Sequence, residues 1–131
     1  MSRQVVFIGA LLGALGVCLG AYGAHGLKSI VSEVQVSTFE VGVRYQMYHA
    51  FFLLFVGMCG FFTDKIKKVI TILVVLGILF FSGSIYLLTL KDLISMDLRF
   101  VGPITPIGGL LLIIAWLTAA IQALKHRKEI K

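Results

Sequence analysis

Four long stretches without a charged residue constrain this chain more than any other feature. They are 21, 19, 22 and 25 residues long and contain no Asp, Glu, Lys or Arg: Gln4–Ala24, Tyr45–Thr63, Val69–Leu90 and Phe100–Leu124. A helix needs about 20 predominantly apolar residues to cross the hydrocarbon core of a bilayer. These stretches also lack the alternation of apolar and polar residues that a transmembrane barrel strand shows. The sequence therefore predicts an all-α membrane protein with four transmembrane helices.

The composition agrees with lipid as the solvent. Of the 131 residues, 59% are hydrophobic and 14% are charged, whereas soluble domains carry about 25% charged residues. No linker or low-complexity segment interrupts the chain. We expect a single transmembrane domain over residues 1–131, with spans at about 4–24, 45–63, 69–90 and 104–124. A signal peptide over Met1–Ala24 is an alternative, although its uncharged run exceeds the roughly 7–15 residues of a typical signal core.

The basic residues are distributed unevenly between the predicted loops. Four spans place both termini and the 64–68 connection on one side, which holds eight basic residues: Arg3, Lys65, Lys67, Lys68, Lys125, Arg127, Lys128 and Lys131. The other side holds four basic and four acidic residues: Lys28, Arg44, Lys91, Arg99, Glu33, Glu40, Asp92 and Asp97. Cytoplasmic loops carry the excess of Lys and Arg, so we expect both termini in the cytoplasm. The net charge of +6 thus indicates topology and contact with the lipid bilayer rather than with nucleic acid.

Small residues form a stripe on the first predicted helix. Its five glycines recur at spacings of four and three residues, which places them on one face: Gly9, Gly13, Gly16, Gly20 and Gly23. Small residues let a neighbouring helix backbone approach closely, which favours association in lipid. The fourth span repeats the pattern with Gly108, Ala115 and Ala119. We expect the two stripes to close a compact four-helix bundle, with a homodimer through the first stripe as the alternative.

The connection between the first two spans is the longest one. Apolar residues at helical spacing from Ile30 to Tyr45 alternate with polar ones, which predicts an amphipathic segment at the membrane interface. Ser37 and Glu40 match a capping box and predict that the second helix begins there. Thr105 followed by Pro106 predicts the start of the fourth helix, with Thr105 as the N-cap.

Polar and aromatic residues gather at the span ends that face away from the termini. The set comprises Tyr22, His25, Arg44, Tyr45, His49, Ser84, Lys91 and Thr105. Polar side chains at membrane depth are costly and often mark functional sites. Interfacial anchoring by Tyr and snorkelling by Arg and Lys are the structural alternatives. We predict one outer-leaflet polar cluster, in which His25 and His49 share a network or a ligand.

Four local signatures follow one another along the chain. They are GAYGAHGLK at 20–28, RYQMYHA at 44–50, FSGSIY at 81–86 and GPITPIGG at 102–109. Together they resemble the family called domain of unknown function 423, or uncharacterised protein family 0382, to which the eukaryotic transmembrane protein 256 is similar. The resemblance covers nearly the whole chain and implies a four-span bacterial inner-membrane protein. It implies no particular activity, substrate or cofactor.

The residues favour a non-enzymatic role. No predicted span contains Asp or Glu, although a transporter or ion-coupled pump of this size would be expected to need one. A single haem between His25 and His49 is conceivable. A hydrolase that uses Ser84 with His49 would lack a carboxylate partner, and no Cys/His spacing indicates a metal site.

We therefore predict a binder of lipid or small amphiphiles, or a subunit or assembly factor of a membrane complex. The protein could also associate with itself as a homo-oligomer. A channel or small-molecule transporter is the main alternative. A single-haem protein or a membrane-embedded enzyme is less favoured.

Overall fold

The computed structural model describes residues 2–94, 97 and 99–130, and its regular elements are all helical. Four long helices make up most of the chain: α1 (Ser2–Ala24), α2 (Glu33–Met58), α3 (Asp64–Thr89) and α5 (Ile104–Ile130). Three short elements lie in the connections: η1 (Leu27–Ser29), α4 (Lys91–Ile94) and η2 (Arg99–Val101). The prediction of an all-α fold is confirmed.

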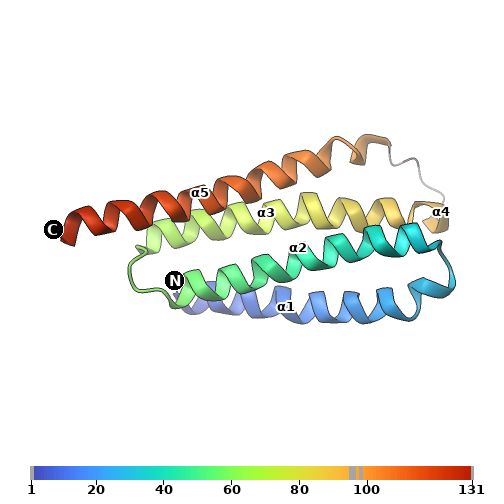
Figure 1. The fold of residues 1–131 in the computed structure, drawn as a ribbon, viewed down its shortest axis with the longest axis horizontal. Helices are drawn as coiled ribbons and strands as arrows, with labels where there is room; N and C mark the ends of the chain where they lie inside the picture. Colours follow the sequence, from blue (N-terminus) through green and yellow to red (C-terminus); the bar gives the residue numbers. More distant parts are fainter. Residues whose placement is uncertain (1, 95–96, 98, 131) are drawn as a thin grey trace.

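The long helices lie side by side in the order α1, α2, α3, α5, and each runs antiparallel to its chain neighbour (Figure 1). One end of the molecule holds the start of α1, the connection 59–63 and the end of α5. We call it the basic end, because the side chains that it carries include Arg3, Lys65, Lys67, Lys68 and Lys125. The opposite end holds η1, α4 and η2.

The outer helices α1 and α5 make no backbone contact with each other in the part of the chain that the structure describes. The expectation that their small-residue stripes close the bundle is therefore wrong. The physical reason is that each stripe is already filled by a neighbour. Added Cβ atoms at Gly9 and Gly23 would lie 3.0 Å from the Ala50 carbonyl oxygen and from the Phe39 ring, both on α2.

The stripe of α5 faces α3 instead. Gly108 lies directly against the backbone of Phe80 and Phe81. Ala115 is fully buried, and Ala119 packs against the apolar core. The small residues thus set close helix spacing within each neighbouring pair, α1 with α2 and α5 with α3.

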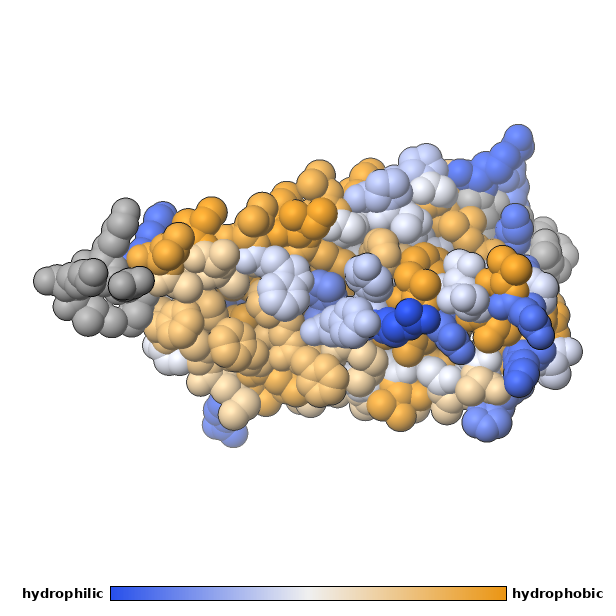
Figure 2. Space-filling view, viewed as in Figure 1, coloured by the Kyte–Doolittle hydropathy of each residue, from blue (hydrophilic) through white to orange (hydrophobic). Residues whose placement is uncertain are grey.

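Among the residues that the structure describes, three helical segments are long and apolar enough to cross a membrane: Ser2–Ser29, Asp64–Thr89 and Arg99–Lys125. Helix α2 has similar length, with 26 residues, but its first half carries charged and polar side chains. Large apolar side chains cover the outer surface, including Phe7 and Leu124, which are 67% and 65% exposed. Figure 2 shows this apolar surface over much of one face, with hydrophilic residues gathered toward the opposite end.

Two predicted helix starts are corrected by the structure. Helix α2 begins at Glu33, and its capping box is formed by Ser32 and Gln35 rather than by Ser37 and Glu40. Ser32 has the same spacing to a Gln and lies five residues earlier, so the helix extends through Ser37. The predicted interfacial segment is therefore mostly the first turns of α2 and not a separate amphipathic element.

Helix α5 begins at Ile104, so Thr105 lies in its first turn and is not the N-cap. The Thr105 hydroxyl forms a hydrogen bond with the Ser84 hydroxyl on α3. Helix α3 ends at Thr89, so Lys91 lies beyond it, at the start of α4.

The interior differs between the two halves of the molecule. A cluster of buried apolar residues fills the half near the basic end: Val5, Phe52, Leu53, Val56, Phe62, Ile70, Val74, Ile78, Leu112 and Ala115. Toward the opposite end, polar side chains form hydrogen bonds that join neighbouring helices. This polar half contains most of the sequence-predicted site residues.

Candidate functional site

The end of α1 carries two members of the predicted polar cluster. His25 is exposed, and its Nδ1 lies 2.9 Å from the carbonyl oxygen of Ala21, one turn earlier on the same helix. The Tyr22 ring packs edge-on against Phe39 of α2, with centroids 6.1 Å apart. In this arrangement His25 satisfies a carbonyl at the end of its own helix.

His49 is buried at 4% exposure on α2, and both of its ring nitrogens have partners. Its Nδ1 lies 2.7 Å from the carbonyl oxygen of Tyr45 and therefore donates to it. The indole Nε1 of Trp116 on α5 donates to the His49 Nε2 across 3.0 Å. These two bonds define a neutral imidazole with the proton on Nδ1. Neither nitrogen is free to ligate a haem iron or to activate a nucleophile without breaking a bond.

Ser84 and Thr105 link α3 to α5. Their hydroxyls are hydrogen-bonded, and the Ser84 hydroxyl also donates to the Phe81 carbonyl across 2.9 Å. Ser84 thus has partners other than His49, so the geometry of a serine hydrolase is not formed here. The hydroxyl pair joins two neighbouring helices.

The remaining members lie at the surface. Arg44 pairs with Glu40 one turn away, at 4.0 Å, and both side chains are at least half exposed. Lys91 is also exposed. The structure therefore brings together Tyr45 with His49 and Ser84 with Thr105, while the contacts of His25 and His49 go to different partners.

A network around Gln46 was not predicted from the sequence. The Gln46 side chain, 4% exposed, donates to the Leu12 carbonyl of α1 across 2.9 Å and accepts from the Tyr86 hydroxyl of α3 across 2.8 Å. The Ser82 hydroxyl of α3 donates to the Gly42 carbonyl of α2 across 2.7 Å. A sequence feature that predicts such a network was present: Gln46 and Ser82 lie in uncharged stretches, where a polar side chain needs a hydrogen-bond partner within the protein.

A buried lysine lies at the basic end. Lys67 is 4% exposed, and its ammonium group donates to the Ser2 hydroxyl across 2.7 Å and to the Gly57 carbonyl across 3.0 Å. Gly57 belongs to the last turn of α2, whose carbonyl groups lack partners within the helix. Lys67 therefore caps the C-terminus of α2 and ties the start of α1 to it.

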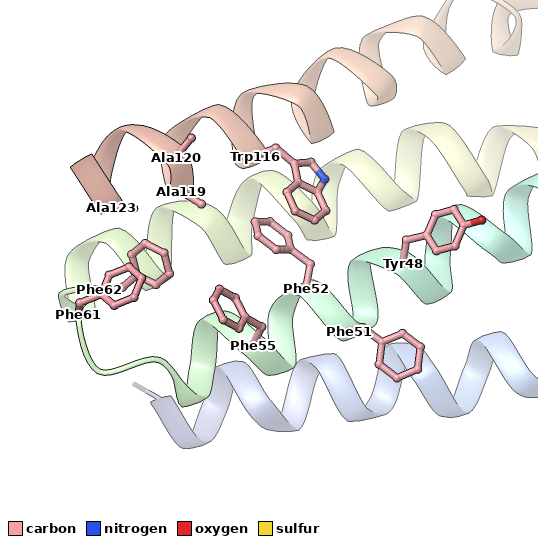
Figure 3. A pocket seen from close by; sticks show the side chains of 10 residues that line it. All are labelled: Tyr48, Phe51, Phe52, Phe55, Phe61, Phe62, Trp116, Ala119, Ala120 and Ala123. Carbon is pink, nitrogen blue, oxygen red and sulfur yellow. The ribbon is translucent and has the colours of Figure 1, made fainter. Parts of the chain in front are cut away.

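A groove of about 490 Å³ lies between α2 and α5. Its lining is almost entirely apolar and comes from α2, α5 and the connection between α2 and α3 (Figure 3): Tyr48, Phe51, Phe52, Phe55, Phe61, Phe62, Trp116, Ala119, Ala120 and Ala123. We call it the aromatic groove. Phe rings from α2 and the connection form one wall, and three alanines of α5 form a smooth second wall.

A stack of two rings lies in the part of the aromatic groove away from the basic end (Figure 3). Phe52 and Trp116 lie parallel, with centroids 4.0 Å apart and planes inclined by 13°. The bond from Trp116 to His49 holds the indole in place. The other end of the groove is bounded by Phe61, Phe62 and Ala123, which lie toward the basic end (Figure 3).

The charges at the two ends of the molecule are paired differently. The two ion pairs found within the described residues, Glu40–Arg44 and Asp97–Arg99, both lie toward the opposite end. The Arg99 guanidinium, 2.9 Å from the carboxylate, holds the pKa of Asp97 below its usual range. At the basic end, the exposed lysines have no such pair among the described side chains.

The chain resembles known bacterial proteins. Residues 19–109 match the family described as "Protein of unknown function (DUF423)". The chain is 41% identical over 123 residues to the UPF0382 membrane protein of Staphylococcus haemolyticus, which covers 94% of this chain and 97% of that protein.

Two further relatives lie in other genera. The UPF0382 membrane protein YwdK of Bacillus subtilis is 35% identical over 129 residues, which is 95% of this chain and 98% of that protein. The UPF0382 membrane protein of Haemophilus influenzae is 33% identical over 127 residues, which is 97% of this chain and 98% of that protein. No solved structure matches the chain.

Proposed function

The chain belongs to the DUF423 family of membrane proteins, and from this premise we propose that it is a non-enzymatic protein of the bacterial inner membrane whose aromatic groove binds a lipid or small amphiphile. We also propose that all four long helices cross the membrane and that both termini face the cytoplasm.

The position of α2 supports four spans. It lies between α1 and α3 and runs antiparallel to both (Figure 1). Its 26 residues correspond to about 39 Å of helix, which exceeds the roughly 30 Å of a hydrocarbon core. Its buried polar side chains, Gln46 and His49, face partners on the neighbouring helices, so they need not contact lipid.

The aromatic groove is the observation that carries the proposed function. It is concave, nearly apolar and open on one side, which fits a hydrophobic chain or ring better than a polar metabolite. Its Ala wall comes from α5 and its Phe wall from α2 and the following connection, and the stacked rings of Trp116 and Phe52 join α5 to α2. The groove opens on the outer surface of the helices, so a ligand could enter from the bilayer without passing through water.

The alternative functions draw less support from the geometry. A channel or transporter exposes polar groups along a path, whereas every buried side-chain nitrogen and oxygen in the described part of the chain has a hydrogen-bond partner. A partner helix of a larger complex could occupy the same groove, which is the subunit or assembly-factor alternative. The experiment below separates these occupants.

The proposal is tested by filling the groove. Ala120 is exposed and lines it, so Ala120→Phe should occupy the space without disturbing the buried core. Ala14→Phe is the matched control, because Ala14 is exposed on α1 and lies outside the groove. Both variants and the parent protein would be purified in mild detergent and compared by native mass spectrometry and by analysis of extracted small molecules.

We expect the parent protein and Ala14→Phe to retain the same lipid or amphiphile, and Ala120→Phe to lose it while keeping its helical circular dichroism spectrum. Equal retention by all three proteins would contradict the groove as a binding site. A copurifying polypeptide that is lost only in Ala120→Phe would instead assign the groove to a partner subunit.

A further inference from the structure

We propose that the hydrogen bond between His49 and Trp116 is a pH-sensitive switch of the aromatic groove. Protonation of His49 releases the Trp116 indole, and the groove then loses its ligand. The release of ligand rests on the proposed function, whereas the switch itself is a property of the protein without ligand.

The hydrogen bonds of His49 require a neutral imidazole. Its Nδ1 donates to the Tyr45 carbonyl oxygen across 2.7 Å, so its Nε2 keeps the lone pair that accepts from the Trp116 Nε1 across 3.0 Å. An indole nitrogen can only donate, and both nitrogens of a protonated imidazole can only donate as well. Protonation therefore sets two N–H groups against each other, and no rotation of the imidazole restores an acceptor. The bond exists only while His49 is uncharged.

Trp116 is a movable part of the groove wall. Its side chain lines the groove and is 49% exposed, whereas the Phe52 ring stacked on it is buried at 5% exposure. Within the described part of the chain, the bond to His49 is the one hydrogen bond that the indole makes. An indole that loses this bond is free to turn toward the exposed side, while Phe52 stays in the core. The shape of the groove then changes where α5 faces α2.

No described carboxylate is placed to offset a charge on His49, and an unpaired buried charge is costly. On α2, Glu40 lies nine residues before His49 and Arg44 five residues before it, and both are exposed. The other charged side chains described on the long helices are Glu33 at the start of α2 and, at the basic end, Arg3, Asp64, Lys65, Lys67, Lys68 and Lys125. The remaining titratable side chains on or next to these helices stay uncharged in mild acid: Cys18, Tyr22, Tyr45, Tyr48, Cys59 and Tyr86.

The switch can be observed directly, because Trp116 is the only tryptophan of the chain and its fluorescence reports on this indole alone. The purified protein would be titrated in mild detergent from about pH 8 to about pH 5, which spans the range in which histidine ordinarily titrates. We expect one reversible change in the emission of Trp116, with an unchanged helical circular dichroism spectrum.

Two variants identify the group that titrates. In His49→Gln the amide oxygen can still accept from the indole, but the side chain does not titrate. The emission of this variant should stay constant over the same range. His25→Gln with His126→Gln removes the other two histidines of the chain and should keep the change seen in the parent protein.

The same proteins test the link to the groove. Native mass spectrometry would give the lipid or amphiphile that each protein retains at the two ends of the pH range. In the parent protein and in His25→Gln with His126→Gln, acid should reduce retention by about fivefold, the effect of one lost hydrogen bond. In His49→Gln the ratio of acid to neutral retention should stay near one.

The outcomes distinguish the two proposals. A constant emission in the parent protein, or an equal change in His49→Gln, would overturn the switch. Loss of the helical spectrum over the same range would assign the change to unfolding and would overturn it too. A His49-dependent change in emission with equal retention in acid would overturn the link to the groove and leave the proposed function standing. Retention that Ala120→Phe does not alter would overturn the proposed function, while the emission of Trp116 would still establish the switch.

Discussion

At the scale of single residues, the buried polar side chains matter most, because lipid cannot replace a lost partner. Trp116 donates to His49 and stacks on Phe52. Trp116→Phe keeps an aromatic ring at this position but removes the N–H group, so it should lower the free energy of unfolding by about 1 kcal/mol. The measurement is thermal unfolding in detergent, followed by circular dichroism.

The same substitution in a His49→Leu background is the control. There the indole has no imidazole to bond, so Trp116→Phe should cost clearly less than it does in the parent protein. An equal cost in both backgrounds would show that the hydrogen bond contributes nothing and that only ring packing matters.

Gln46 joins three helices and gives a second test at this scale. Gln46→Leu removes its bonds to Leu12 and Tyr86, whereas Tyr86→Phe removes only the second bond. Gln46→Leu should therefore destabilise more, and the double variant should show a coupling of roughly 0.5–1.7 kcal/mol. Strictly additive losses in thermal stability would exclude a shared network.

At the scale of helices, glycine positions determine how closely neighbours approach. A Cβ added at Gly108 would collide with the backbone of α3, while one at Gly109 would meet only the Phe81 ring at 3.6 Å. Backbone cannot move aside as a side chain can, so Gly108→Ala should cost about 1–3 kcal/mol. Gly109→Ala should be neutral or stabilising, because Ala favours helix by about 1 kcal/mol over Gly. Similar stabilities of these two adjacent variants in detergent would contradict the observed α3–α5 contact.

The start of α2 provides another matched pair. Ser32 accepts from the backbone N–H of Gln35, whereas Ser37 lies inside the helix with its side chain exposed. Ser32→Ala should lower the stability by about 1 kcal/mol, and Ser37→Ala should have almost no effect. If Ser37→Ala proved to be the more damaging change, the helix would begin where the sequence pattern alone placed it.

The helices themselves were predictable, because an uncharged stretch near 20 residues long has few other solutions in lipid. Their exact starts were not, because Ser32 and Ser37 each stand three residues before a Gln or a Glu and match the same capping pattern. The local pattern does not choose between them, and the structure places the cap at Ser32.

At the scale of the whole molecule, the order of neighbours was the part that sequence could not provide. The α1 glycines indicate that some helix approaches closely, but not which one, and the structure places α2 there. The candidate site was likewise predictable only in part from the sequence. Tyr45 and His49 share one helix face, so their spacing pairs them, whereas Trp116 comes from α5 and no spacing pattern connects it with His49. The aromatic groove was missed because its Phe and Ala residues resemble ordinary lipid-facing surface.

The whole-molecule prediction concerns orientation. Glu33 and Asp64 are matched positions, since each is an exposed acidic residue in the first turn of a long helix. They lie at the opposite end and the basic end, respectively (Figure 1). Because cytoplasmic loops carry the surplus of Lys and Arg, Glu33→Cys should react with a membrane-impermeant thiol reagent in intact cells, and Asp64→Cys should react only after permeabilisation.

Both variants would be made after changing the native Cys18 and Cys59 to Ala, so that each protein carries a single thiol. Labelling of Asp64→Cys alone in intact cells would reverse the orientation. Labelling of both would mean that the two ends of the molecule do not lie on opposite sides of one membrane. Such a result would contradict the proposal that α2 and α3 cross the membrane in opposite directions, because the whole length of α2 separates Glu33 from Asp64.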